Sequence, residues 1–192
     1  MLKTRPGGRT ARTRQAVFAA VEALLEEKEP SIISMGEIAA HAGVAPTSLY
    51  RRWGDVRTLL TEVAVDRLMR DAPLPDTGSL RGDLSAWTRS VATGLAGPNG
   101  STFFRVYVGA VPRSGEEAAG RAQAIMARIK QIDAMLERAR VRGERTPAVF
   151  EVTDHLLAPL YMRALFGVPA DASVADGLVD HLLKADRTLY AG

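Results

Sequence analysis

Apolar side chains recur at helical spacing along almost all of this 192-residue sequence. Val17, Val21, Leu24 and Leu25 form the first such stripe, and comparable stripes follow towards the end of the chain. Residues three or four positions apart share one face of an α-helix, whereas a half-buried strand alternates at every second residue. No segment alternates for long enough to indicate a strand, so the sequence predicts an all-α fold.

Capping residues and a glycine predict where several of the helices begin and end. Ser34 and Glu37 have the spacing of a capping box, in which each side chain accepts from the other residue's backbone N–H. Gly43 suits the left-handed residue that ends the helix opened there. Asp55 and Ser79 stand at N-cap positions of two later helices.

Further along, Thr146 followed by Pro147 predicts another N-cap, and Ser173 the start of the last helix. About nine helices are expected, with a larger bundle formed by the last five. The predicted ranges are 10–28, 35–42, 46–53, 55–68, 79–95, 103–111, 115–142, 147–166 and 173–189.

The composition excludes several classes of protein. The chain has no cysteine, which excludes a disulfide scaffold, a Cys-ligated metal site and a thiol nucleophile. No window approaches the roughly 18 apolar residues of a membrane span, and the N-terminal residues lack the apolar core of a signal peptide. We therefore expect a cytoplasmic protein without membrane contact.

The sequence offers no set of catalytic or metal-ligating residues. His155 follows Asp154 and His181 follows Asp180, but consecutive residues of a helix do not face one another. Glu151 lies one turn before His155, which is more typical of a surface pair than of a metal site. Phosphate-binding glycine loops and nucleophile elbows are absent too, so we expect neither an enzyme nor a cofactor.

Positive charge is concentrated at the start of the chain. Residues 1–57 carry the whole net charge of +3, and the remainder is balanced. A basic arm on a small module is typical of a protein that binds a polyanion, although a solvated tail has the same composition. The cations that precede the first acidic residue are Lys3, Arg5, Arg9, Arg12 and Arg14.

Two short predicted helices, 35–42 and 46–53, are joined by a tight turn and preceded by a longer helix, as in a helix-turn-helix. Small or apolar side chains occur where these helices must pack closely. Polar or exposed ones occur where the second helix would face a major groove, namely at Pro46, Thr47, Ser48, Arg51 and Arg52.

Three segments, taken in order, match the sequence pattern of a known protein family. They are Ile38-Ala-Ala-His-Ala-Gly-Val44, Ser48-Leu-Tyr-Arg-Arg-Trp53 and Leu59-Leu60. Over about residues 10–60 they resemble the DNA-binding module of TetR/AcrR-family transcriptional regulators. The resemblance implies a DNA-binding domain at 1–54, a connecting helix at 55–73 and a ligand-binding and dimerisation bundle at 74–192.

The function implied by this resemblance is a ligand-responsive regulator, most often a repressor, that binds a palindromic operator in double-stranded DNA as a homodimer. Tyr50 would place its hydroxyl on a phosphate, and Arg51 and Arg52 would contact phosphates or guanine edges. The implied DNA-contacting residues are Arg9, Ser34, Ala45, Pro46, Thr47, Ser48, Tyr50, Arg51, Arg52 and Arg57.

Two positions depart from the family pattern. Ala45 stands where the family often has a serine that caps the recognition helix, and alanine cannot accept that bond. Val56 stands at the position of a family lysine, for which the adjacent Arg57 is the available substitute. Both departures affect individual phosphate contacts rather than the docking mode.

Residues 155–184 resemble the last two helices of the family, which usually form its dimer interface. The interface residues implied are His155, Leu156, Pro159, Leu160, Arg163, Leu178, His181 and Leu182. An effector pocket inside the bundle is implied as well, although nothing identifies the small-molecule effector. Its candidate lining residues are aromatic or adaptable and could equally be ordinary core: Trp87, Phe103, Phe104, Tyr107, Met126 and Tyr161.

Two alternatives stay open from the sequence. One is an all-α enzyme that acts on small molecules in the same bundle, although residues 74–192 show no convergent acid, base and nucleophile. The other is a DNA-binding dimer whose bundle serves dimerisation alone, without an effector.

Overall fold

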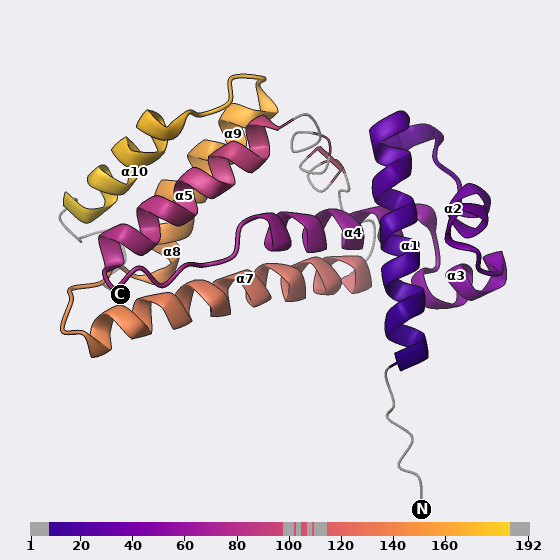
Figure 1. Cartoon of the computed structure of the whole chain (residues 1–192), viewed down its shortest axis with the longest axis horizontal. Coiled ribbons are helices and arrows are strands. Elements are labelled where there is room, and N and C mark those ends of the chain that lie inside the picture. Colours follow the sequence, from indigo (N-terminus) through magenta and orange to yellow (C-terminus); the bar gives the residue numbers. More distant parts are fainter. Residues whose placement is uncertain (1–7, 98–101, 103–104, 107–108, 110–114, 185–192) are drawn as a thin grey trace, which may run out of the picture. The chain divides into compact units, whose positions relative to one another are not determined.

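The computed structural model describes residues 8–97, 102, 105–106, 109 and 115–184, without the side chains of Arg9 and residues 116–125. Within these residues every regular element is helical, which confirms the all-α prediction (Figure 1). None of the helices described is long and apolar enough to cross a membrane. The chain divides into two compact units, Met1–Ala64 and Val65–Gly192, and the border falls inside a helix.

The first unit contains three helices and the first half of a fourth. The capping box forms as predicted, since the Ser34 hydroxyl accepts from the Glu37 N–H at 3.3 Å and the Glu37 carboxylate accepts from the Ser34 N–H at 3.0 Å. Gly43 adopts the left-handed conformation (φ 65°), which side chains with a Cβ rarely adopt. These helices are α1 (Gly8–Glu27), α2 (Met35–Ala42), α3 (Pro46–Trp53) and α4 (Val56–Asp71), with a 3₁₀ turn, η1 (Pro30–Ile32), after α1.

The core of the first unit fixes the orientation of α3. Helix α1 packs against α2, and α2 packs against α3. Ile38 of α2 and Leu49 of α3 are completely buried, so α3 is held by one face only. The other fully buried side chains around them include Val17, Val21, Leu24, Leu59 and Val63.

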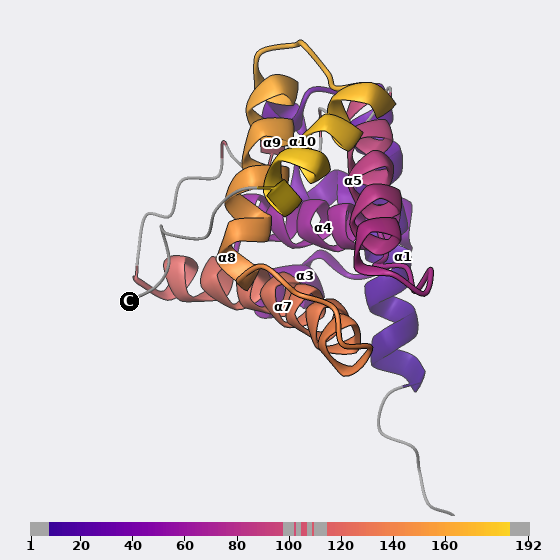
Figure 2. The ribbon, with the colours of Figure 1, turned by 90° about the vertical axis from the view of Figure 1, so that its left-hand side faces the viewer.

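The second unit is a helical bundle. Helices α8, η2 and α9 follow one another without a break and lie beside α10 and α5 (Figure 2). The predicted helix at 103–111 falls largely on residues outside those described. The remaining elements are α5 (Leu80–Ala96), α7 (Gly115–Val141), α8 (Val149–Val152), the π-helical η2 (Thr153–Leu157), α9 (Ala158–Leu165) and α10 (Ala172–Lys184).

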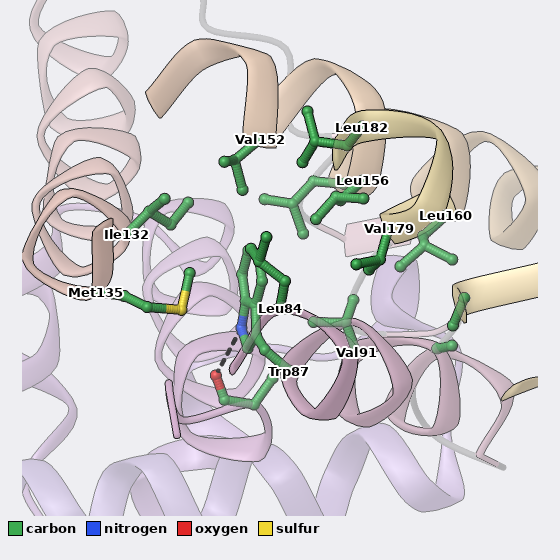
Figure 3. Close-up of a cluster of buried hydrophobic side chains, with 14 of the residues drawn as sticks. Leu84, Trp87, Val91, Ile132, Met135, Val152, Leu156, Leu160, Val179 and Leu182 are labelled. Carbon is green, nitrogen blue, oxygen red and sulfur yellow. Dashed lines mark hydrogen bonds between the residues drawn. The ribbon is translucent and has the colours of Figure 1, made fainter. Parts of the chain in front are cut away.

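Trp87 lies at the centre of the bundle core. It is completely buried, and its indole N–H donates to the Ala72 carbonyl at 3.2 Å, because a buried N–H without a partner would be costly. Figure 3 shows side chains from α5, α7, the α8–η2–α9 segment and α10 converging around it. They are Leu84, Val91, Ile132, Met135, Val152, Leu156, Leu160, Val179 and Leu182.

The π-helical turn of η2 has a local cause. Pro159, near the start of α9, has no N–H to donate, and its ring would crowd the carbonyl four residues earlier in a regular α-helix. Widening the preceding turn from Thr153 to Leu157 relieves that crowding. The predicted helix at 147–166 is therefore present but contains one wide turn.

Two helix starts differ from prediction. Helix α8 begins at Val149 rather than at Pro147, because the Glu151 carboxylate accepts from the Ala148 N–H at 2.5 Å and no Thr146 cap forms. Helix α10 begins at Ala172, and Asp171 rather than Ser173 accepts the free N–H of Val174 at 2.9 Å.

Candidate nucleic-acid interface

Helix α3 has one buried and one exposed face. Leu49 and Trp53, four residues apart, point into the core. Pro46, Thr47 and Tyr50 are exposed on the opposite side, and Tyr50 keeps 54% of its surface accessible. Pro46 occupies the first helical turn and Ala45 provides no side-chain cap, as expected. The helix thus presents a contiguous outward surface of the kind that enters a major groove.

A carboxylate of α4 is hydrogen-bonded to the C-terminal end of α3. Glu62 Oε2 accepts from the Trp53 indole N–H at 2.7 Å, and Glu62 Oε1 accepts from Arg14 Nε of α1 at 3.1 Å. The Arg14 guanidinium lies 3.9 Å from the centre of the Phe18 ring. Glu62 therefore joins three helices, a role that periodicity could not reveal because its partners lie 9 and 48 residues away.

The cations near α3 face little competing negative charge. Arg51 and Arg52 are exposed, and the Arg52 guanidinium lies 4.9 Å from the Trp53 ring centre, a cation–π contact. Asp55 caps α4 by accepting from the Thr58 N–H at 2.7 Å, a bond that lowers the pKa of its carboxyl.

Glu37 is likewise engaged within the unit. Lys28 Nζ donates to Glu37 Oε1 at 2.6 Å, and this bond, with those from Ser34, lowers the pKa of Glu37 to about 2. Because both carboxylates are bound to donors of their own unit, they compete weakly with a phosphate for the arginines.

The remaining predicted DNA contacts are spread over three elements. Arg9 belongs to α1, with its side chain outside those described. The Ser34 hydroxyl donates to Glu37 Oε2 at 2.9 Å, so its proton already has an acceptor inside the capping box. Ser48 and Arg57 are half-buried. These contacts stay predictions.

Three of the predicted interface residues do not lie at the surface. Leu156, Leu160 and Leu182 are at most 3% exposed and pack in the core of their own chain (Figure 3). This corrects their assignment to a contact between chains. Apolar periodicity identifies a helix face that is buried, but not whether the burial is within one chain or between two.

The outward face of the same helices carries other candidates. The rings of His155 and His181 lie 6.3 Å apart, which places this part of η2 beside α10. Met162 and Phe166, at and just beyond the end of α9, are 50% and 72% exposed. Of the other predicted interface residues, Arg163 is exposed, whereas Pro159 and Leu178 are half-buried.

The second unit also contains a cavity of about 310 Å³. Of the predicted pocket residues, Tyr161 lines it, whereas Trp87 is buried in the core and Met126 is 47% exposed elsewhere on α7. Phe103, Phe104 and Tyr107 lie outside the described residues. The lining residues are Val65, Leu68, Met69, Arg128, Ile129, Thr153, Asp154, Leu157, Ala158 and Tyr161.

Two family models match the chain. One, described as bacterial regulatory proteins of the tetR family, covers residues 17–63. The other, the tetracyclin repressor-like C-terminal domain, covers residues 74–182. Together they account for the helix-turn-helix unit and most of the bundle.

Individual relatives agree with these models. The chain is 32% identical over 136 residues to the HTH-type transcriptional regulator AqdR of Rhodococcus erythropolis, over 71% of this chain but only 65% of AqdR. It is 28% identical to the uncharacterised HTH-type transcriptional regulator YdeS of Bacillus subtilis (strain 168), over 93% of this chain and 92% of YdeS.

A solved structure gives the same result. The TetR family transcription regulator SCO0332 superposes with a TM-score of 0.74 at 27% identity, over 89% of this chain and 96% of its own. The exposed face of α3, the two family models and this structural match agree: the chain belongs to the TetR family of DNA-binding transcriptional regulators.

Proposed function

We propose that this regulator represses transcription by binding a palindromic operator as a homodimer, and that a small molecule bound in the second unit relieves the repression. The observation that carries the proposal is the outward face of α3, on which Thr47, Tyr50 and Arg51 are exposed. Leu49 and Trp53 on the opposite face are buried and hold the helix in place. A rigid anchor with an exposed polar face is what groove recognition requires.

Dimerisation and ligand response would act together through geometry. Two recognition helices bind adjacent major grooves only when they are about one DNA turn, roughly 34–36 Å, apart. A ligand that binds better to a dimer with another spacing lowers operator affinity by its difference in affinity for the two arrangements.

Selection from random duplex DNA tests the operator and the dimer at once. We expect the full-length protein to enrich an inverted repeat whose half-sites are about 10 bp apart, centre to centre. Enrichment of a single half-site bound by one chain would contradict the homodimer proposal, and the absence of any enriched sequence would contradict specific recognition.

Replacing Arg51 by alanine is expected to weaken binding to the selected operator by about 1–3 kcal/mol, because a guanidinium contact with phosphate or guanine is lost. Arg51 is exposed on α3, so the fold should be unaffected. Fluorescence anisotropy with the labelled operator gives the affinity, and circular dichroism gives the helix content.

Arg145→Ala serves as the matched control. Arg145 is also exposed and its removal changes the net charge equally, but it lies in the second unit between α7 and α8. Operator affinity should stay close to that of the wild type. Equal losses in the two variants would show that net charge, rather than a contact from α3, governs binding.

Replacing Met162 by aspartate is expected to dissociate the proposed dimer. Met162 is half-exposed on the outward face of α9, and a two-fold interface would bury the new charge twice. A cost of about 2 kcal/mol per copy would raise the dimer dissociation constant about 1,000-fold.

Sedimentation equilibrium measures that constant. Val141→Asp, an equally polar change at an 80% exposed residue ending α7, should leave it unchanged. A Met162→Asp protein that remains dimeric at wild-type concentrations would exclude this face of α9 from the interface.

A further inference from the structure

Arg128 of α7 is a half-buried cation in the wall of the cavity. Its Nη1 donates to the Ala72 carbonyl at 3.0 Å, and its Nη2 donates to the Leu68 carbonyl at 2.9 Å. Helix α4 ends at Asp71, so these oxygens belong to its last turn and to the residue after it. Carbonyls at a helix C-terminus have no partner within the helix, and Arg128 supplies one.

The charge of Arg128 has no counter-ion among the described residues. No ion pair joins it to an Asp or Glu there, and its acceptors are the two carbonyls and, at 3.4 Å, the amide oxygen of Gln131. Burial lowers the pKa of Arg128, because removing a charge from water disfavours the charged form. Its guanidinium also lies 5.7 Å from the centre of the Trp87 ring. A half-buried cation held by neutral groups alone is stabilised further by any anion that reaches it.

The rest of the cavity wall is mostly apolar. Val65, Leu68 and Met69 of α4 lie in this wall with Ile129 of α7 and Leu157 of η2. The volume of about 310 Å³ lies at the lower end of the range of about 300–1,000 Å³ for small-molecule sites. A mostly apolar wall whose described residues include one half-buried cation fits a single compact molecule that has an apolar body and one acidic group.

We propose that the cavity binds an amphipathic organic acid, whose anionic group pairs with Arg128 while its apolar body fills the space between α4, α7 and α9. This inference rests on the proposed ligand response and specifies the chemical class of the effector. The hydroxyls of Thr153 and Tyr161, which also line the cavity, are further polar groups that such a ligand can reach.

Among the described residues of the wall, Asp154 is the one that is acidic. It is exposed, so water screens its repulsion of an anion more than it screens the attraction of the half-buried Arg128. A cationic ligand held by Asp154 is the competing possibility, and the experiment below includes it.

Binding of an acid would alter the end of α4. Hydrogen bonds to an anion are roughly twice as strong as those to a neutral carbonyl, so the bound acid draws the guanidinium away from Leu68 and Ala72. The Leu68 carbonyl in the last turn of α4 then loses this donor, whereas the Ala72 carbonyl keeps the Trp87 indole N–H. Because α4 is one helix whose first half belongs to the first unit, this loss connects the cavity with the helix-turn-helix.

Three matched probes test the ligand class on the full-length protein by titration calorimetry. They share one naphthalene body and differ in charge: 1-naphthaleneacetate, 1-naphthaleneacetamide and 2-(1-naphthyl)ethylammonium. We expect the acid to bind about 10- to 100-fold more tightly than the amide, because its bond to Arg128 joins two charges. The ammonium compound should bind most weakly.

Variants assign this preference to Arg128. Arg128→Gln should bind acid and amide equally, and Arg128→Lys, which keeps the charge, should retain part of the preference. Arg138→Gln is the control, because Arg138 of α7 also donates to a backbone carbonyl, that of Pro75 at 2.7 Å, but does not line the cavity. It should preserve the full preference, and thermal unfolding of each variant without ligand shows that it is folded.

An amide or ammonium compound that binds as tightly as the acid would overturn the proposal. So would a lack of binding by the acid, or an undiminished preference in the Arg128→Gln protein. Operator affinity measured with and without the acid separates this inference from the proposed function. If the acid binds through Arg128 and leaves operator affinity unchanged, the ligand class stands and the proposed ligand response fails.

Discussion

Binding to the operator should weaken about 10⁵-fold when the salt concentration rises from 50 to 200 mM, an estimate for about five phosphates neutralised by each subunit. Each Lys or Arg that binds a phosphate releases a condensed counter-ion, so the logarithm of the affinity falls linearly with the logarithm of the salt concentration. For ten phosphates per dimer the slope is about −9. The exposed Arg51 and Arg52, with Arg57 and the basic residues preceding them, are the cations expected to contribute.

Anisotropy titrations at several salt concentrations give this slope directly. An Arg52→Ala dimer lacks two phosphate contacts if Arg52 makes one in each subunit, and its slope should be shallower by about 2. Arg145→Ala should keep the wild-type slope. A response that is flat in the wild-type protein would contradict phosphate binding by the first unit altogether.

Replacing Asp83 by alanine should lower the free energy of unfolding of the second unit by about 2–3 kcal/mol. Asp83 is completely buried at the start of α5. Its Oδ1 accepts from the Thr77 N–H at 2.5 Å and from the Thr77 hydroxyl at 2.8 Å, and Arg142 Nη2 lies 3.4 Å from its Oδ2.

Removal of the Asp83 carboxylate leaves the Thr77 N–H without its acceptor, whereas the Thr77 hydroxyl can still donate to the Ser79 carbonyl at 3.3 Å. The expected loss is that of hydrogen bonds to a charged acceptor, about 1.5–3 kcal/mol, because the remaining partner Arg142 is exposed and keeps its bond to Glu144 at 2.8 Å. Urea unfolding followed by circular dichroism measures the loss.

Asp76→Ala is the control for Asp83. Asp76 pairs with the same Arg142 at 3.5 Å, but its side chain is 61% exposed, so its removal should cost less than about 1 kcal/mol. Similar losses of unfolding free energy in the two variants would show that the burial of Asp83 does not increase its contribution to stability. Asp83→Asn, which retains one carbonyl oxygen for Thr77, should fall between them.

The sequence predicted well those features that depend on neighbouring residues. The Ser34–Glu37 box, the left-handed Gly43 and the N-caps at Asp55 and Ser79 all form, because each needs only a few consecutive residues. Thr146 shows the limit of this reasoning. A second local candidate, Glu151, caps the same helix from three residues inside it.

Features that depend on distant partners could not be predicted in the same way. Leu156, Leu160 and Leu182 have the apolar spacing of an interface, but they fill the core of their own chain. Arg128 gives no sequence signal at all, because its partners lie 56 and 60 residues earlier. Its importance depends on burial, which charge and spacing along the chain do not encode.

The wide turn of η2 constrains how this part of the chain can change in length. A π-helical turn holds one residue more than an α-helical turn, so it takes up this residue while Leu160 still reaches the core and Tyr161 the cavity wall. Deleting a residue between Thr153 and Leu157 would force tighter winding and press the Pro159 ring against the carbonyl four residues earlier. Homologues with a proline at this position are therefore expected to keep the extra residue.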